Sequence, residues 1–255
     1  MASPTTRPNP VLFASLLAGG ALALSACGTN INLSFGADIN GSGNHTTQTY
    51  EVGDFDKIDI CCGLDVLIEI EEGDGNSVEI TIDDNLHEYL DVTIANGETL
   101  EVKPKSSSSI DHTGTLVLRI AGHEITGLDV GAGSDVGGDF PATDNFTLKV
   151  SSGSDTTVSI DADEVAVEAS SGSDVDLSGR GDAVDIKANS GSDVRLTALE
   201  VQTAKVDASS GSNIEIDVAD SIEGKASSSS DVDIWGNPRN VRIETTSSSD
   251  IHLHD

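Results

Sequence analysis

A short motif that recurs at a nearly constant spacing constrains the fold of this chain more than any other feature. In its fullest form it reads Ser-Gly-Ser-Asp, and it returns throughout the second half of the sequence. Its last position is occupied in turn by Asp135, Asp155, Asp174, Asp193, Asn213, Asp231 and Asp250. The intervals are 20, 19, 19, 20, 18 and 19 residues. A period this short and regular predicts a β-solenoid in which each repeat forms one coil.

The residues on both sides of the motif alternate between apolar and polar types. Around Asp174, for example, Val167 and Ala169 precede the motif, and Val175 and Leu177 follow it. Such alternation is typical of a strand with one buried face, and a single coil cannot bury that face alone. The predicted fold is therefore all-β, a right-handed parallel β-helix with coils of about 19 residues. The handedness follows from the crossover preference of parallel strands.

The motif itself supplies the residues of a tight corner. In five repeats a glycine lies two residues before the last position, where we expect a positive φ. These structural turn residues are Gly133, Gly153, Gly172, Gly191 and Gly211. Serine and aspartate can bond neighbouring backbone amides at such corners, and identical residues can form ladders from coil to coil.

The repeated carboxylates raise the question of a metal. A row of aspartates repels itself unless each carboxylate is hydrated, hydrogen-bonded or bound to a cation, and calcium is the alternative cofactor. Calcium-binding nonapeptide repeats need two Gly-rich turns per coil with the apolar residue two after the Asp. Here there is one such turn, and the apolar residues follow at one and three. We therefore predict a structural ladder, without a metal or other cofactor. The residues that calcium would use are Asp135, Asp155, Asp174, Asp193, Asp231 and Asp250.

The first 27 residues predict export and lipid attachment. Arg7 supplies a positive start, and the apolar stretch 11–24 is too short to span a bilayer as a mature helix. It runs into Leu-Ser-Ala-Cys, which ends at Cys27 and resembles a bacterial lipobox. That resemblance implies a signal peptide of residues 1–26 and acylation of Cys27. The alternative is an ordinary secretory signal followed by an unrelated cysteine. We expect an exported protein that is anchored through lipid on Cys27 to the bilayer, at the outer face of the cell membrane or at the outer membrane.

The remaining chain divides into a tether and one domain. Residues 27–49 are predicted to be a flexible tether, and residues 50–255 a single β-helix domain. A hidden copy of the repeat surrounds Asp65, so coils are assigned to 57–70 and 124–255. The insert between them, about 71–123, is predicted to form a small sheet beside the helix or over its N-terminal end. The last coil leaves an open strand edge, which we expect the insert, a partner or self-association to cover.

Cys61 and Cys62 fall in the columns that serines occupy in later coils. Adjacent cysteines cannot form a metal clamp of the CxxC kind. In an oxidising compartment they can form a vicinal disulfide, pair between molecules or leave one thiol buried. We interpret them as structural.

The charge and the absence of catalytic motifs narrow the function. The chain carries 13 basic and 44 acidic residues, a net charge of −31, which argues against nucleic acid as a partner. His252 and His254 are interpreted as outward residues of a terminal strand. Acidic pairs such as Asp174 and Asp176 recur in most coils, so none stands out as a catalytic acid and base. No nucleophile or nucleotide motif is present, and we predict no catalytic residues and no enzyme.

Several short sequence segments occur in an order that resembles the order found in one bacterial family. After the lipobox come Phe-Asp-Lys-Ile-Asp-Ile at 55–60, Gly-Leu-Asp-Val at 63–66, Asn-Leu at 85–86 and Gly-Glu-Thr-Leu-Glu-Val at 97–102, followed by the Gly-Ser-Asp coils. This order is similar to that of the putative auto-transporter adhesin, head GIN domain family, over roughly residues 53–251. The resemblance implies an exported β-helix with an adhesin role and no catalytic residues.

We therefore predict an anchored lipoprotein of the bacterial cell envelope with a non-catalytic domain. Its role is structural or adhesive, or the binding of an envelope, glycan or protein ligand. One alternative is a carbohydrate-active envelope enzyme built on a β-helix. Another is a calcium-dependent surface assembly module.

Overall fold

The computed structural model describes residues 39–71, 77–105 and 109–254. These residues form nineteen strands and one short 3₁₀ helix, η1 (His87–Tyr89), and no helix among them is long enough to cross a membrane. The first nine strands are β1 (Ile39–Asn40), β2 (His45–Tyr50), β3 (Lys57–Cys61), β4 (Asp65–Glu71), β5 (Ser77–Asp83), β6 (Leu90–Ala95), β7 (Thr99–Pro104), β8 (Ile110–Asp111) and β9 (Leu116–Ala121). The other ten are β10 (Gly127–Gly131), β11 (Asp135–Asp139), β12 (Thr143–Ser151), β13 (Asp155–Ser170), β14 (Asp174–Asn189), β15 (Asp193–Ser209), β16 (Asn213–Ser227), β17 (Asp231–Trp235), β18 (Asn240–Thr245) and β19 (Asp250–Leu253).

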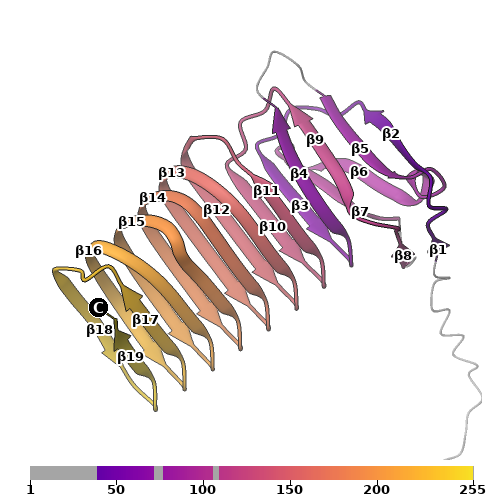
Figure 1. Ribbon diagram of the computed structural model, residues 1–255. Coiled ribbons are helices and arrows are strands. Elements are labelled where there is room, and N and C mark those ends of the chain that lie inside the picture. The colour runs from indigo at the N-terminus through magenta and orange to yellow at the C-terminus, as the bar shows by residue number, and fades with distance from the viewer. Residues whose placement is uncertain (1–38, 72–76, 106–108, 255) are drawn as a thin grey trace, which may run out of the picture. The chain divides into compact units, whose positions relative to one another are not determined.

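The predicted parallel β-solenoid is confirmed, and its coils stack in the register of the motif (Figure 1). Asp155 pairs with Asp174 and Asp174 with Asp193, and the same register continues to the last coil. The hidden repeat belongs to the stack, because Asp65 pairs with Asp135 in parallel. The motif therefore sets the register in which the strand after each corner pairs with the corresponding strand of the neighbouring coil.

Each coil has two walls with the core between them. Wall 1 contains the segments that run into the motif corner, and wall 2 contains the segments that leave it. The long strand β13 leaves one corner on wall 2, bends, and enters the next corner on wall 1, as do β14 and β15. Side chains alternate inward and outward along both walls, as in the column of Val167, Ile186 and Val206, which are fully buried. Stacking of such columns removes apolar surface from water, which stabilises the coils collectively.

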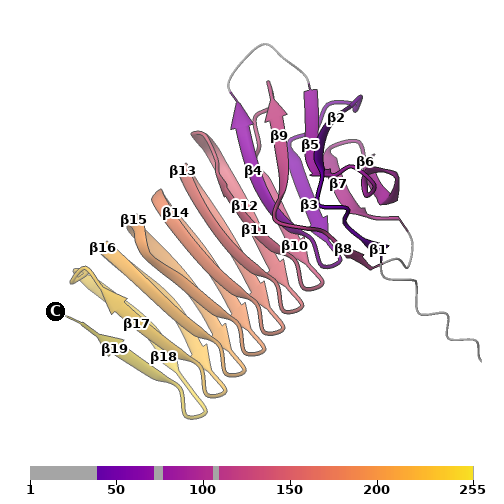
Figure 2. The same cartoon turned by 45° about the vertical axis from the view of Figure 1, so that its right-hand side comes forward.

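The insert builds the N-terminal end of the stack. Strand β7 pairs in parallel with β3, and β9 pairs in parallel with β4, which adds one further layer. Strands β6 and β5 then pair antiparallel with β7 and β9, and β2 pairs antiparallel with β5. The parallel stacking therefore ends here. The insert lies at the opposite end from β18 and β19, so the possibility that it covers the last coil is wrong (Figure 2).

The predicted tether is too long at its C-terminal end. Residues 27–38 lie outside the described residues, but β1 pairs with β8, and β2 pairs with β5 over six residues. Five of the six side chains of β2 are exposed. The strand is held by backbone hydrogen bonds, and Tyr50 at its end is its one partly buried side chain. Alternation of apolar residues therefore gives no signal for it.

Candidate functional site

The motif corners are tight turns with two successive residues of positive φ. In the coil of Asp174 these are Ser171, at 59°, and Gly172, at 70°. The glycines singled out in the sequence all have φ between 69° and 73°; they are Gly133, Gly153, Gly172, Gly191 and Gly211. In the last two coils Ser229 and Ser248 take the same conformation. Glycine is therefore favoured at the corner but is not required there.

The third residue of the motif is a buried serine that links one coil to the next. Ser192 is completely buried, and its Oγ accepts a hydrogen bond from the Asn189 amide at 3.1 Å. The same Oγ donates to the Ala169 carbonyl of the preceding coil at 3.1 Å. Ser173, Ser212 and Ser230 repeat this pattern. In the first coil this third motif position is occupied by Leu64, which is buried. An apolar residue there is the one sign in the sequence that the position faces inward.

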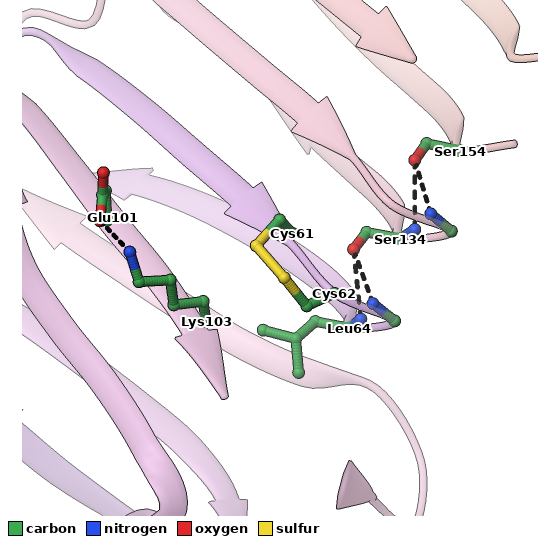
Figure 3. The surroundings of a disulfide bond; sticks show 9 residues. Cys61, Cys62, Leu64, Glu101, Lys103, Ser134 and Ser154 are labelled. Atoms are coloured by element: carbon green, nitrogen blue, oxygen red, sulfur yellow. Dashed lines mark hydrogen bonds and ion pairs between the residues drawn. A yellow bond between two sulfur atoms is a disulfide. The ribbon is translucent and has the colours of Figure 1, made fainter. Parts of the chain in front are cut away.

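The two adjacent cysteines form a disulfide at the corner of the first coil (Figure 3). Cys62 has a φ of 75°, like the serines in its column, and Cys61 pairs with Gly131. Beside them, Ser134 Oγ accepts hydrogen bonds of 3.2 Å from the Gly63 and Leu64 amides. The disulfide is thus part of a corner, and the serine ladder supports it from the next coil.

The motif aspartates form an outward column along the corner. Asp174 lies between Asp155 and Asp193, and its pKa is raised by partial burial and by these two like charges. At the next coil Asn213 replaces the aspartate, and its Nδ2 donates to Asp193 Oδ1 at 2.9 Å. Among residues 39–71, 77–105 and 109–254, no group of three or more His, Cys, Asp or Glu side chains could hold a metal. Calcium at this column remains a hypothesis.

We expect Asp174→Asn to stabilise the protein slightly at pH 7, because it removes a carboxylate that lies between two like charges. The amide can donate to a neighbouring carboxylate, as Asn213 does, and it removes repulsion. Because the pKa of Asp174 is raised on folding, its penalty exists above the folded-state pKa and disappears as the pH falls below the unfolded-state value of 3.8. Urea unfolding at pH 7 and near pH 3.5 measures the difference.

The exposed Asp250 at the end of the column has one stacked neighbour and is the matched control. Asp250→Asn should change stability less than Asp174→Asn. Repeating the measurements with millimolar calcium tests the alternative cofactor. Calcium bound by the column would stabilise the parent, and Asp174→Asn would remove that gain. A loss of stability in Asp174→Asn without calcium would contradict the repulsive column.

A groove of about 740 Å³ runs along the outside of wall 1. It crosses β12, β13, β14, β15, β16 and β18, at right angles to the strands. Small side chains line it from two adjacent outward columns, Thr147 and Ala166 from one and Ala183, Thr203 and Ser221 from the other. This groove was not predicted from the sequence. Its sign there is that these five outward positions hold small residues.

Charges alternate along two columns of wall 1. The column that borders the groove contains Asp185, Lys205, Glu223 and Arg242. A second column contains Asp129, Lys149, Glu168, Lys187, Asp207, Lys225 and Glu244. Stacked neighbours form ion pairs, such as Lys187 Nζ with Glu168 at 2.7 Å and Lys225 Nζ with Asp207 at 3.1 Å. This wall is therefore charged but locally balanced, despite the acidity of the whole chain.

The two C-terminal histidines lie on wall 2 of the last coil. The His254 ring stacks on Trp235 with centroids 4.3 Å apart, and its Nε2 lies 2.6 Å from Asp233 Oδ1. The His252 ring lies 6.5 Å from the His254 ring. His252 is an outward residue of the terminal strand β19, and His254 directly follows that strand, where one carboxylate and one indole hold it in place.

Solved structures with the same fold come from bacteria. An adhesin-like protein of Bacteroides fragilis, described as a putative adhesin, matches with a TM-score of 0.74 and 16% identity, over 85% of this chain and 100% of that one. A putative lipid binding protein of Parabacteroides distasonis matches with a TM-score of 0.64 and 16% identity, over 84% and 99%. A putative adhesin of Parabacteroides merdae matches with a TM-score of 0.62 and 15% identity, over 86% and 100%. At these identities the likeness shows the fold.

The family comparison agrees with the fold and with the order of the short sequence segments. A search of curated proteins found no match. The family model described as "Putative auto-transporter adhesin, head GIN domain" matches residues 54–238, which include the first coil, the insert and most of the later coils. The chain therefore belongs to the putative auto-transporter adhesin, head GIN domain family.

Proposed function

We propose that this protein is a non-catalytic binding module of the bacterial cell envelope, exported and anchored through lipid on Cys27. The descriptions of its family and of two fold neighbours name adhesins, and that of a third names a lipid-binding protein. The lipobox-like residues that end at Cys27 support the anchor. Uniform ladders along both walls support binding rather than catalysis, because they single out no acid and base.

The groove on wall 1 carries this proposal. It crosses six strands, and at about 4.8 Å per strand it extends for about 24 Å. From β14 to β16 each coil presents one small and one charged side chain in the same two columns, so this part of the groove suits an extended chain with a repeating unit. Threonine and serine hydroxyls and charges of both signs offer donors and acceptors to a polar ligand. The ligand class that fits is an uncharged or zwitterionic glycan strand.

Blocking the groove tests the proposal. The test uses residues 35–255, a compact unit that contains the whole described core; we call it the body. A glycan array first identifies bound strands. Thr203→Trp, which fills the middle of the groove, is then expected to weaken binding at least about tenfold. Thr157→Trp is the matched control, because Thr157 is an equally exposed threonine on wall 2.

Three results would contradict the proposal. The first is that the body binds no glycan, and the second is that the two tryptophan variants bind the glycan equally well. Release of shortened glycan during incubation would instead favour the carbohydrate-active alternative.

A further inference from the structure

The last coil ends in two strand edges that no described strand covers. Strand β18 pairs with β16 on wall 1, and β19 pairs with β17 on wall 2, but their outer edges have no partner among the described residues. Three large apolar side chains of the described chain are exposed, and two of them lie here. They are Val241, 37% exposed, and Leu253, 64% exposed. Open edges of this kind pair readily with another chain.

We propose that a second copy of this chain covers this end, forming a tail-to-tail dimer with two-fold symmetry. In this dimer β18 pairs antiparallel with β18 of the second copy, centred on Ile243. On the other wall β19 pairs antiparallel with β19 of the second copy, centred on His252. The proposal concerns the end of the solenoid and is independent of the groove ligand.

Backbone direction selects these two centres. The Thr246 amide donates to the Ala226 carbonyl, so even-numbered residues of β18 direct their peptide groups toward β16. The peptide groups of Ile243 and of its odd-numbered neighbours therefore face outward. On β19 the amides of Asp250 and His254 donate to the preceding coil, which leaves the peptide groups of Ile251 and Leu253 facing outward. Antiparallel pairing then makes Ile243 a hydrogen-bonded pair with its copy and His252 a non-hydrogen-bonded pair.

A single two-fold axis can relate the two copies of β18 on wall 1 and the two copies of β19 on wall 2. The corner between the two strands is centred between Ser247 and Ser248, which both have positive φ. Ile243 and His252 lie equally far from that centre along the chain. A two-fold axis perpendicular to the walls can therefore pass close to both residues. Isologous dimers require this kind of self-complementary surface.

The charge columns of wall 1 continue through the proposed contact. The column that ends at Arg242 would meet Glu244 of the second copy. The column that ends at Glu244 would meet Arg242 of the second copy. Both columns therefore keep their alternation of sign across the interface. Opposite charges on facing strands stabilise pairing, and like charges oppose it.

The inward and outward residues of wall 2 also match. Ile251 would face Leu253 of the second copy, which buries the most exposed apolar side chain of the described residues. Asp250 would lie opposite His254 of the second copy. The other end of the stack finishes in antiparallel strands that belong to the chain itself.

Cysteine crosslinking of the body tests the register. Non-hydrogen-bonded partners have Cα atoms about 4.5 Å apart, within the range for a disulfide. His252→Cys on the axis is expected to give a covalent dimer under mild oxidation. Asp250→Cys is the control on the same strand and face, because its copies would lie about 13 Å apart. Crosslinking through Asp250→Cys but not through His252→Cys would overturn the proposal.

Charge reversal tests the same contact without cysteines. In sedimentation velocity at about 150 mM salt, which screens the net charge, the parent body should dimerise with increasing concentration. Arg242→Glu should weaken dimerisation at least about tenfold, and adding Glu244→Arg should restore it. Lys205→Glu, two coils inward in the same column, should leave dimerisation unchanged. A parent that stays monomeric, or an Arg242→Glu variant that dimerises like the parent, would overturn the proposal, with circular dichroism showing that each variant is folded.

Discussion

Replacing Gly224 by alanine is expected to destabilise the body by about 4 kcal/mol or more, or to prevent folding. Gly224 lies inside β16, stacked on Val206 of β15, and has a φ of 146°. A Cβ at this position would overlap the carbonyl oxygen of Val206. Because that oxygen belongs to the backbone of the neighbouring coil, it cannot move without breaking the β15–β16 pairing. The strained φ adds to the penalty.

Gly211→Ala is the matched control for this prediction. Gly211 is a corner glycine with a φ of 72°, and no atom lies within 4 Å of a Cβ built there. Serine is found in the equivalent position at Ser229 and Ser248. We expect a loss of about 1 kcal/mol, measured as the shift in urea unfolding. Equal losses in the two variants would contradict the steric argument.

The second large effect concerns Asp83, the one aspartate with no exposed surface among the described residues. Its carboxylate accepts hydrogen bonds from the Thr113 amide at 2.8 Å, the Thr113 hydroxyl at 2.6 Å and the Gly43 amide at 2.6 Å. It thereby joins the segment before β2 to the segment before β9. Asp83→Ala leaves these donors unpaired, and we expect a loss of about 3 kcal/mol in the free energy of unfolding.

The pH dependence of Asp83 gives a second readout. Burial alone would raise its pKa, but the hydrogen bonds from Thr113 and Gly43 outweigh burial and lower it. The stabilisation is therefore present above the ordinary aspartate pKa of 3.8 and is lost as the pH falls through the lower folded-state value. The stability difference between the parent and Asp83→Asn should shrink as the pH falls below about 3.8. A difference that grows below that pH would contradict this account.

Other carboxylates act in the opposite direction. Burial raises the pKa of Asp59 and Asp129, which are stacked on each other in wall 1. Their penalty is relieved as the pH falls through their folded-state pKa values toward 3.8. The contribution of these two carboxylates to the pH dependence should therefore be opposite in sign to that of Asp83 and should precede it as the pH falls.

The sequence predicted those parts of the fold that repeat. The spacing of the aspartates determined the stacking register, and it located the coil at Asp65, although an insert separates that coil from the rest of the stack. Parts of the fold without a repeat were poorly predicted. Strand β2 is held by backbone hydrogen bonds and its side chains are almost all exposed, so its residues were predicted to belong to a tether. The groove arises from small outward side chains that align only when the coils are stacked. Gly224 looks ordinary in the sequence, because its close approach to Val206 exists only between coils.

The serine ladder has a consequence for how this protein can vary in length. Four of the buried serines, Ser173, Ser192, Ser212 and Ser230, bond within their own corner and to the coil before it, so these coils carry their own attachment to the stack. Adding or removing one unit of about 19 residues from the middle would leave the antiparallel N-terminal strands and the last coil intact. It would change only the distance between the two ends and the length of the groove. The length of such a molecule can therefore be altered by duplication or deletion of whole repeats, without redesign of its ends.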